Sequence, residues 1–272
     1  MPFLKINGAH LWYEDSGLGS EAVVFSHGLL MNHTMFERQV EMLKDSYRCV
    51  RFDHRGQGRS EVTESGYDIG FLAKDAAELI RQLGCGPCHF AGLSMGGFVG
   101  LELAIHFPEL LRSLTLIETS ADPEPRSSRF KYRLMAAFGR RFGFKPLLGR
   151  IMPLMFGRTF LDDPARTPDK AKWSEALLTA DREGILRAAT GVIERCGVHD
   201  QLGEIQTPTL ILVGDEDHTT PLLRAQRMQN GIRGSQLAII PRAGHSSTIE
   251  QPERVTAAML DFMVGLGNRR AQ

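Results

Sequence analysis

The serine at position 94 lies in a pattern that could make its hydroxyl a nucleophile. The residues Gly92-Leu93-Ser94-Met95-Gly96 form a G-x-S-x-G motif. The apolar run before the motif predicts a buried strand, and residues 98–107 predict a helix. A strand, a tight turn and a helix are the setting in which this motif raises a serine hydroxyl above a sheet. The alternative is an ordinary serine at a strand–helix junction of small residues.

A serine hydroxyl attacks at neutral pH only when a base takes its proton and a third group orients that base. His245 is the candidate base, because it follows the last predicted strand through a glycine turn. The candidate acid lies in residues 214–221, after the preceding predicted strand. Asp217 fits best there, Asp215 is the second choice, and Glu118 after an earlier strand is the third. Serine, acid and histidine then follow in the chain order that accompanies this motif.

Attack of a serine on an acyl carbon creates an oxyanion, which two preorganised main-chain N–H groups can stabilise. The residue after the nucleophile, Met95, supplies the first of these groups. We expect the second from the turn that follows the strand 22–26, where His27-Gly28-Leu29 occurs, and we assign it to Leu29.

Eight predicted strands and five predicted helices would position these residues. The strands cover 3–6, 11–14, 22–26, 47–52, the run from Cys88 to the motif, 114–118, 209–213 and 237–240. The helices cover 34–44, 72–83, 98–107, 221–230 and 252–266. Asn7-Gly8 predicts a hairpin between the first two strands. The later alternation predicts an α/β fold, a mostly parallel eight-stranded sheet with helices on both faces, whose ligands bind at the carboxyl ends of the strands.

Residues 122–206 interrupt the alternation and predict a helical cap over the strand ends, so that residues 1–121 and 207–272 form the core domain. An apolar stripe in the cap predicts either core packing or the lining of a pocket; its members are Phe130, Leu134, Phe138 and Phe142. Met side chains adapt to varied acyl groups. We expect the substrate pocket to be lined by Leu30, Phe138, Met152, Met155 and Phe156.

Composition excludes several other classes of protein. The 272 residues carry 32 basic and 32 acidic side chains, so no overall charge favours nucleic acid. The chain has no apolar run of about 18 residues that could span a membrane. We see no signal peptide and expect a cytoplasmic protein. No metal site or cofactor is predicted, and the oligomeric state cannot be inferred.

Basic residues without acidic neighbours fill the stretch between Glu124 and Asp162, which favours either a solvated face or contact with membranes or anionic substrates.

These motifs together resemble the α/β-hydrolase superfamily over essentially the whole chain. The matching segments are His27-Gly28-Leu29, Asp53 to Ser60, Gly92 to Gly97, Gly214 to Pro221 and Gly244-His245. The resemblance implies a Ser94–Asp217–His245 triad and a structural role for the loop 53–60. A serine at position 94 distinguishes the chain from the haloalkane dehalogenase and epoxide hydrolase branches, which carry an aspartate nucleophile there.

Within the superfamily the chain resembles cap-bearing esterases and lactonases. The segment 90–97 is similar to that of 3-oxoadipate enol-lactonases, and acyl-homoserine lactonases and perhydrolase-type esterases share the same catalytic groups. The resemblance implies a cofactor-independent serine hydrolase whose partner is a small ester or lactone. Hydrolysis of carbon–carbon bonds, perhydrolysis and a slow-turnover ligand receptor are the alternatives that it leaves open.

Overall fold

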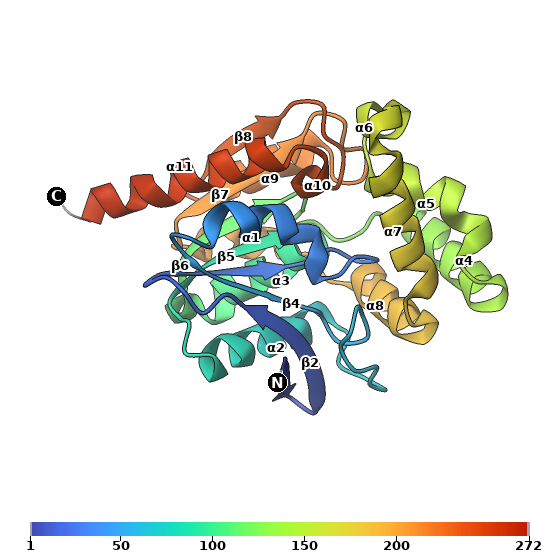
Figure 1. The fold of residues 1–272 in the computed structure, drawn as a ribbon, viewed down its shortest axis with the longest axis horizontal. Coiled ribbons are helices and arrows are strands. Elements are labelled where there is room, and N and C mark those ends of the chain that lie inside the picture. The colour runs from blue at the N-terminus through green and yellow to red at the C-terminus, as the bar shows by residue number, and fades with distance from the viewer. Residues whose placement is uncertain (1, 271–272) are drawn as a thin grey trace.

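The computed structural model describes residues 2–270, which form an eight-stranded sheet in the order β1-β2-β4-β3-β5-β6-β7-β8 (Figure 1). The strands are β1 (Phe3–Ile6), β2 (Ala9–Asp15), β3 (Ala22–Ser26), β4 (Arg48–Phe52), β5 (Cys88–Leu93), β6 (Leu111–Ile117), β7 (Thr209–Gly214) and β8 (Gln236–Ile240). β2 pairs antiparallel with both β1 and β4, and the pairs from β4 through β8 are parallel. The buried strands β3, β5 and β7 consist mostly of apolar and small residues, as is typical of parallel strands covered on both faces.

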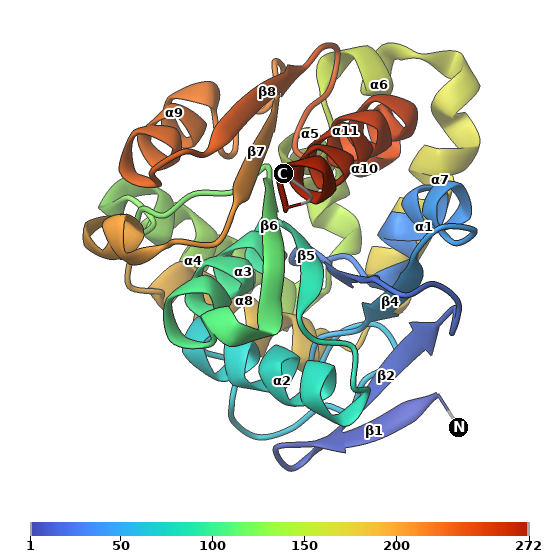
Figure 2. The same ribbon diagram turned by 90° about the vertical axis from the view of Figure 1, so that its left-hand side faces the viewer.

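Helices cover both faces of this sheet (Figure 2). One face is covered by α1 (Glu37–Leu43), α10 (Ser247–Glu250) and α11 (Pro252–Arg270), and the other by α2 (Ile69–Gln82), α3 (Met95–His106) and α9 (Leu222–Gly231). Two hydrophobic clusters follow the same division, one with Leu72 and Leu101 and the other with Phe36 and Met259. The predicted fold class is therefore confirmed.

The helices predicted to begin at residues 34 and 98 begin elsewhere in the structure. Residues 33–36 form a 3-10 turn before α1, because the side chain of Asn32 accepts a hydrogen bond from the N–H of Thr34 and caps that turn. α3 begins at Met95 rather than at 98, because the turn between strand and helix lies at the preceding Ser94, which has φ 51°. Apolar periodicity shows where a helix packs, but it does not show where a cap or a sharp turn starts it.

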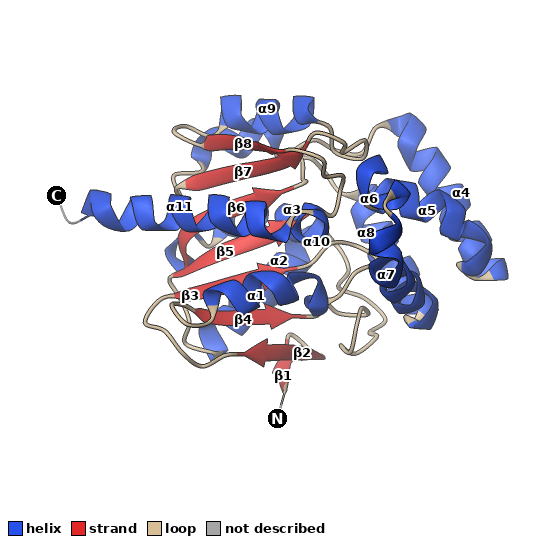
Figure 3. Cartoon of the chain, turned by 45° about the horizontal axis from the view of Figure 1, so that its top comes forward, coloured by secondary structure: helices blue, strands red, loops and turns tan. Residues whose placement is uncertain are grey.

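A helical segment comprising residues 122–206 lies beyond the carboxyl ends of the parallel strands (Figure 3). Its helices are α4 (Arg126–Phe142), α5 (Leu148–Met155), α6 (Arg158–Asp162), α7 (Thr167–Thr179) and α8 (Arg182–Glu194). The figure shows the arrowheads of β3 to β8 pointing toward this segment. Residues after these strands and residues of the segment therefore face one another.

The apolar stripe of α4 is exposed to solvent, so the prediction that it packs in a core or lines a pocket is wrong. Phe130, Leu134, Phe138 and Phe142 are 40% to 66% exposed. A neighbouring set of residues, Tyr132, Met135, Ala136 and Gly139, faces the interior at a spacing of three and four. The sequence contained two adjoining stripes, and spacing alone could not show which one faced inward.

The basic residues of α4 find some of their counter-charges on α8. Arg133 lies 2.7 Å from Glu194, and Arg140 lies 3.8 Å from Glu183. The hypothesis of a solvated face with counter-charges elsewhere in the chain agrees with these pairs. None of the helices in residues 2–270 has the length and apolar character needed to cross a membrane.

Candidate active site

The serine of the motif occupies a sharp turn between β5 and α3. Ser94 has φ 51° and ψ −110°, a conformation that costs a non-glycine residue energy and is typical of functional turns. The turn fits because two neighbours lack side chains. A Cβ at Gly92 would lie 2.1 Å from the carbonyl oxygen of Gly96, and a Cβ at Gly96 would lie 2.0 Å from that of Ser26. The motif glycines thus allow the strand, the turn and the helix to pack together.

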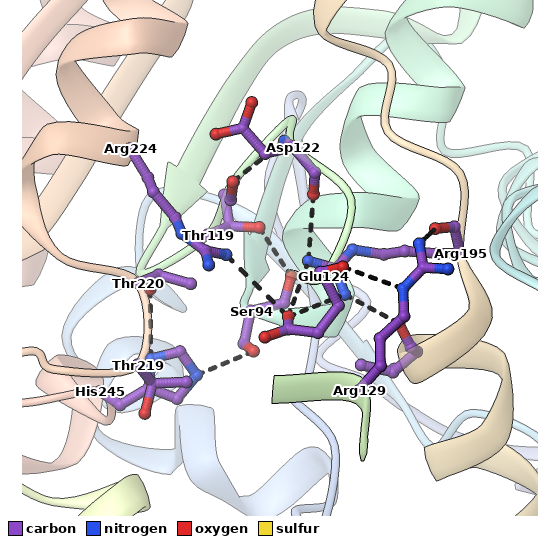
Figure 4. A network of polar contacts seen from close by, with 12 residues as sticks. Ser94, Thr119, Asp122, Glu124, Arg129, Arg195, Thr219, Thr220, Arg224 and His245 are labelled. Carbon is purple, nitrogen blue, oxygen red and sulfur yellow. Dashed lines mark hydrogen bonds and ion pairs between the residues drawn. The ribbon is translucent and has the colours of Figure 1, made fainter. Parts of the chain in front are cut away.

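A continuous set of hydrogen bonds joins three residues from different strand ends. His245 Nε2 lies 2.8 Å from Ser94 Oγ, and His245 Nδ1 lies 2.9 Å from Asp217 Oδ2. Figure 4 shows the imidazole of His245 directed at the hydroxyl of Ser94. His245 comes after β8, Asp217 after β7 and Ser94 after β5. Their common position follows from the parallel sheet, since all three follow carboxyl ends of strands.

Hydrogen bonds hold the Asp217 carboxylate in one orientation. Its Oδ1 accepts from the N–H groups of Thr219 at 2.7 Å and Thr220 at 3.0 Å, and its Oδ2 accepts from the Thr220 hydroxyl at 2.6 Å. Burial alone would raise the pKa of Asp217, but the charge of His245 and the hydrogen bonds from His245 and Thr220 outweigh it and hold that pKa well below its usual range. The carboxylate is therefore ionised and oriented toward the imidazole.

The two other candidate acids make different contacts. Asp215 accepts a hydrogen bond from the main-chain N–H of Arg242 at 2.7 Å. Glu118 is fully buried, and both its carboxyl oxygens lie 2.9 Å from the N–H of Gly214. Burial and the nearby charge of Asp217 raise the pKa of Glu118 well above its usual value. Neither group is hydrogen-bonded to His245.

Two main-chain N–H groups beside Ser94 have no hydrogen-bond acceptor within residues 2–270, namely those of Leu29 and Met95. Both residues lie where the sequence analysis expected an oxyanion site. The turn that carries Leu29 is strained, because the next residue, Leu30, has φ 68°. The turn is held by the buried Gln57, whose Oε1 accepts from the Leu30 N–H at 3.0 Å and whose Nε2 lies 3.7 Å from Met95 Sδ.

A cavity of about 170 Å³ adjoins the serine and is lined mainly by apolar side chains of the helical segment. Its apolar lining includes Leu29, Leu30, Met135, Phe144, Leu147, Ile151, Met155, Ile185 and Val192. Its polar lining consists of Ser94, Glu124, Tyr132, Arg195, Thr219, Thr220 and His245. The structure thus brings Ser94 and His245 to a mostly apolar cavity, which is the usual form of a small-molecule site.

The structure places only some of the expected pocket residues at this cavity. Leu30 and Met155 line it, whereas Phe138, Met152 and Phe156 do not. Phe156 is buried and stacks on Phe160, and Phe138 packs against Phe142 on the outer side of α4. A cap built from short helices turns residues a few positions apart toward opposite sides, so composition alone could not separate them.

The glutamate at the end of α10 holds the loop that carries the histidine. Glu250 Oε2 accepts from the N–H of Gly244 at 2.9 Å, and its Oε1 accepts from that of Ser246 at 3.1 Å, so both neighbours of His245 are bonded to it. The same Oε2 accepts from the N–H of Gly157 in the helical segment at 2.9 Å. Burial raises the pKa of Glu250 to about 7, although these three N–H groups oppose the shift.

Sequence reasoning did not identify several of these groups. Gln57 is hydrogen-bonded to the turn that carries Leu29, Thr220 to Asp217, and Glu250 to the loop that carries His245. Glu124 and Tyr132 line the cavity. The spacing of Tyr132, Met135, Ala136 and Gly139 was the signal that could have shown which side of α4 faces the site.

Among the described residues, no group of three His, Cys, Asp or Glu side chains could hold a metal ion.

Replacing Gln57 by leucine should lower kcat by about 10- to 100-fold and leave KM within about threefold of the unmodified protein. The leucine removes the acceptor for the Leu30 N–H, so the turn that carries the Leu29 N–H is displaced, and an oxyanion donor acts mainly in the transition state. Steady-state kinetics on one ester gives both constants. Gln82→Leu is the matched control, because Gln82 lies exposed on α2. An equal rise in KM with unchanged kcat would contradict the positioning role.

The burial of Glu250 predicts a pH-dependent stability. Its pKa is about 7 in the folded protein and about 4.5 in an unfolded chain, so the folded state binds the proton more tightly. This contribution is fully present below about pH 4.5 and is lost as the pH rises through 7, up to about 3 kcal/mol. Urea unfolding at pH 5 and pH 8 should show a smaller loss of stability in Glu250→Gln than in the unmodified protein. The exposed Glu253→Gln is the control, and equal losses in both variants would refute the prediction.

Known proteins resemble the chain in sequence and in structure. A family model described as the alpha/beta hydrolase fold matches residues 21–252. The 3-oxoadipate enol-lactonase 1 of Acinetobacter baylyi is 30% identical over 242 residues, which are 89% of this chain and 88% of that protein. A protein of Variovorax paradoxus that carries a carbamate hydrolase name, RutD, is 27% identical over 259 residues, 93% of this chain and 96% of its own.

Solved structures agree with the sequence comparisons. The structure of a thermophilic esterase from Thermogutta terrifontis, with malate bound, superimposes with a TM-score of 0.89 at 31% identity. The match covers 97% of this chain and 98% of the esterase. This match therefore spans both the sheet and the helical segment.

Proposed function

The chain belongs to the alpha/beta hydrolase fold family, and its relatives make it a hydrolase; from the geometry of its site we propose that it is a serine hydrolase of carboxylic esters or lactones. One observation carries this proposal. The hydrogen-bonded series Asp217–His245–Ser94 ends at a mostly apolar cavity, beside two main-chain N–H groups that have no other acceptor in the described chain. No metal ion or cofactor takes part in the proposed reaction.

The proposed reaction begins with attack of Ser94 Oγ on the substrate carbonyl carbon. His245 Nε2, 2.8 Å away, takes the hydroxyl proton, and the ionised Asp217 stabilises the imidazolium that forms. The negative charge that develops on the carbonyl oxygen is stabilised by the N–H groups of Leu29 and Met95. These donors are fixed before reaction, so they need little reorganisation in the transition state.

The tetrahedral intermediate collapses when His245 returns its proton to the departing oxygen. An ester then releases its alcohol, while a lactone ring opens and keeps the new hydroxyl on the acyl group. Water, deprotonated by His245, attacks the acyl-enzyme and releases the acid and Ser94. The same histidine thus serves both halves of the reaction, which is why its orientation by Asp217 and by the loop held by Glu250 is important.

The helical segment supports a division into a core domain, residues 1–121 and 207–272, and a cap, residues 122–206. Side chains from α4, α5 and α8 supply much of the cavity lining. An apolar cavity of about 150 Å³ accommodates a molecule the size of benzene. With a volume of about 170 Å³, this cavity favours short acyl groups of up to about six carbons over long fatty chains.

Titration of released acid in a pH-stat tests the proposal, because it detects esters and lactones alike. The panel contains ethyl and p-nitrophenyl esters of short and long acids, an enol-lactone, and acyl-homoserine lactones. Sustained acid release from short esters or lactones supports the proposal, and the faster of the two classes identifies the substrate type. Absence of repeated turnover on every member of the panel would contradict it.

A further inference from the structure

A polar cluster lies inside the otherwise apolar cavity, on the side of Ser94 away from His245 (Figure 4). Its central group is the carboxylate of Glu124, which is 12% exposed. Glu124 Oε2 lies 3.4 Å from both Nη atoms of Arg195 and 4.0 Å from Nη1 of Arg224. Both guanidinium groups therefore contact the same carboxylate oxygen.

The other oxygen of this carboxylate, Glu124 Oε1, has no hydrogen-bond donor within residues 2–270. Tyr132 lines the same cavity, and its hydroxyl also has no hydrogen-bond partner within that part of the chain. Glu124 and Tyr132 line the same cavity, and burial together with the charge of Glu124 raises the pKa of Tyr132. Polar groups in an apolar cavity are normally paired, so these two indicate a ligand group that pairs with them.

Arg195 and Arg129 fix the position of Glu124. Arg195 lies 3.9 Å above the ring of Phe98 and donates to the carbonyl oxygens of Val192 and Asp122 at 2.8 and 3.2 Å. Arg129 donates to the main-chain carbonyl of Glu124 itself at 2.9 Å. The guanidinium groups thus fix the carboxylate through one oxygen, and Figure 4 shows the other oxygen on the side of Ser94.

The reaction geometry decides which part of a substrate reaches this acceptor. The departing oxygen must lie near His245 Nε2, which protonates it. The acyl group then extends to the other side of Ser94, where Figure 4 shows Glu124. We propose that Glu124 and Tyr132 form a subsite that selects acyl groups carrying a hydroxyl or N–H donor, an inference that rests on the proposed ester or lactone hydrolysis.

Matched esters test the subsite. Ethyl 3-hydroxybutyrate and ethyl butyrate differ by one hydroxyl on the acyl group, and monoethyl succinate carries a carboxylate instead. The unmodified protein should hydrolyse the hydroxylated ester with a kcat/KM about 10- to 100-fold above that of ethyl butyrate, since a hydrogen bond to a charged acceptor is a strong one. Because Glu124 presents an acceptor, monoethyl succinate should be hydrolysed no faster than ethyl butyrate.

Two variants assign the preference to the cluster. In Glu124→Gln the guanidinium groups hold the amide oxygen, so the charged acceptor is replaced by a neutral amide N–H₂, to which the substrate hydroxyl can only accept. The ratio of the two kcat/KM values should therefore fall about tenfold, since hydrogen bonds to charged groups are the stronger ones. Tyr132→Phe should reduce the ratio by a smaller factor and keeps the test valid if the first variant is unstable. Glu194→Gln, an exposed glutamate of α8, is the matched control and should retain the ratio.

The outcomes separate this inference from the proposed function. In one outcome the protein hydrolyses ethyl butyrate in a reaction that depends on Ser94 and yet shows no preference for the hydroxylated ester; in another it keeps that preference in Glu124→Gln. Either result overturns the proposed subsite and leaves the proposed hydrolase function standing. A preference for monoethyl succinate also overturns it, since the guanidinium groups would then be the recognition element. No turnover of any ester that depends on Ser94 refutes the proposed function itself.

Discussion

Replacing Ser94 by alanine should lower kcat on any ester or lactone substrate by about five to six orders of magnitude. The variant loses the atom that forms the acyl-enzyme, and His245 Nε2 then has no hydroxyl to activate. The strained φ of 51° is a backbone property that alanine retains, so the fold should not change. Initial rates by pH-stat, together with thermal unfolding, measure both effects.

A matched control distinguishes the loss of a nucleophile from a general effect of removing a hydroxyl. Ser46 is exposed between α1 and β4, and Ser46→Ala should retain full activity. A folded Ser94→Ala protein with more than about 1% of the original kcat would be incompatible with attack by this serine.

Replacing Asp217 by asparagine should lower kcat by about four orders of magnitude, with little change in KM. The N–H groups of Thr219 and Thr220 both donate to Oδ1, so the asparagine will place its oxygen there and its N–H₂ at the position of Oδ2. That N–H₂ faces His245 Nδ1 and forces the tautomer that carries its proton on Nε2. Nε2 then cannot accept the proton of Ser94.

The neighbouring aspartate provides the control for this variant. Asp215 was the second candidate for the acid, and its carboxylate accepts a main-chain hydrogen bond from Arg242 rather than contacting the histidine. Asp215→Asn should retain kcat within about tenfold. A larger loss in Asp215→Asn than in Asp217→Asn would reverse the assignment of the two carboxylates.

The sheet could be predicted from the sequence because buried parallel strands appear as short apolar runs. β3, β5 and β7 are such runs, and the alternation with helices indicates a parallel arrangement. The positions of Ser94, Asp217 and His245 could be predicted for the same reason. Each follows the carboxyl end of a strand, and those ends meet at one edge whatever the details of packing.

The residues that orient the site could not be predicted, because their contacts join distant parts of the chain. Gln57 bonds to Leu30 from a loop after another strand, and Glu250 joins the histidine loop to Gly157 of the helical segment. Nothing in the local pattern around these residues shows such a partner. The strained turn at Leu30 could not be predicted either, because leucine is not a residue that favours a positive φ.

The orientation of the helices in the helical segment could be predicted least well from the sequence, for a related reason. Its short helices carry apolar residues on more than one side, as the exposed Phe130 and the interior-facing Met135 of α4 show. Which side faces the cavity depends on how α4 packs on α8, a tertiary contact that periodicity does not encode. Of the five expected pocket residues, the cavity is lined by Leu30 and Met155.

The most direct test of the account is to trap and locate the acyl-enzyme. The protein is mixed with p-nitrophenyl acetate, quenched in acid within milliseconds, digested and analysed by mass spectrometry. The account predicts one acetyl group on the peptide that contains Ser94, formed at the rate of the nitrophenol burst and absent in Ser94→Ala. Rapid release of nitrophenol with acetyl on another residue, or with none on the protein, would contradict the central claim that Ser94 is the nucleophile.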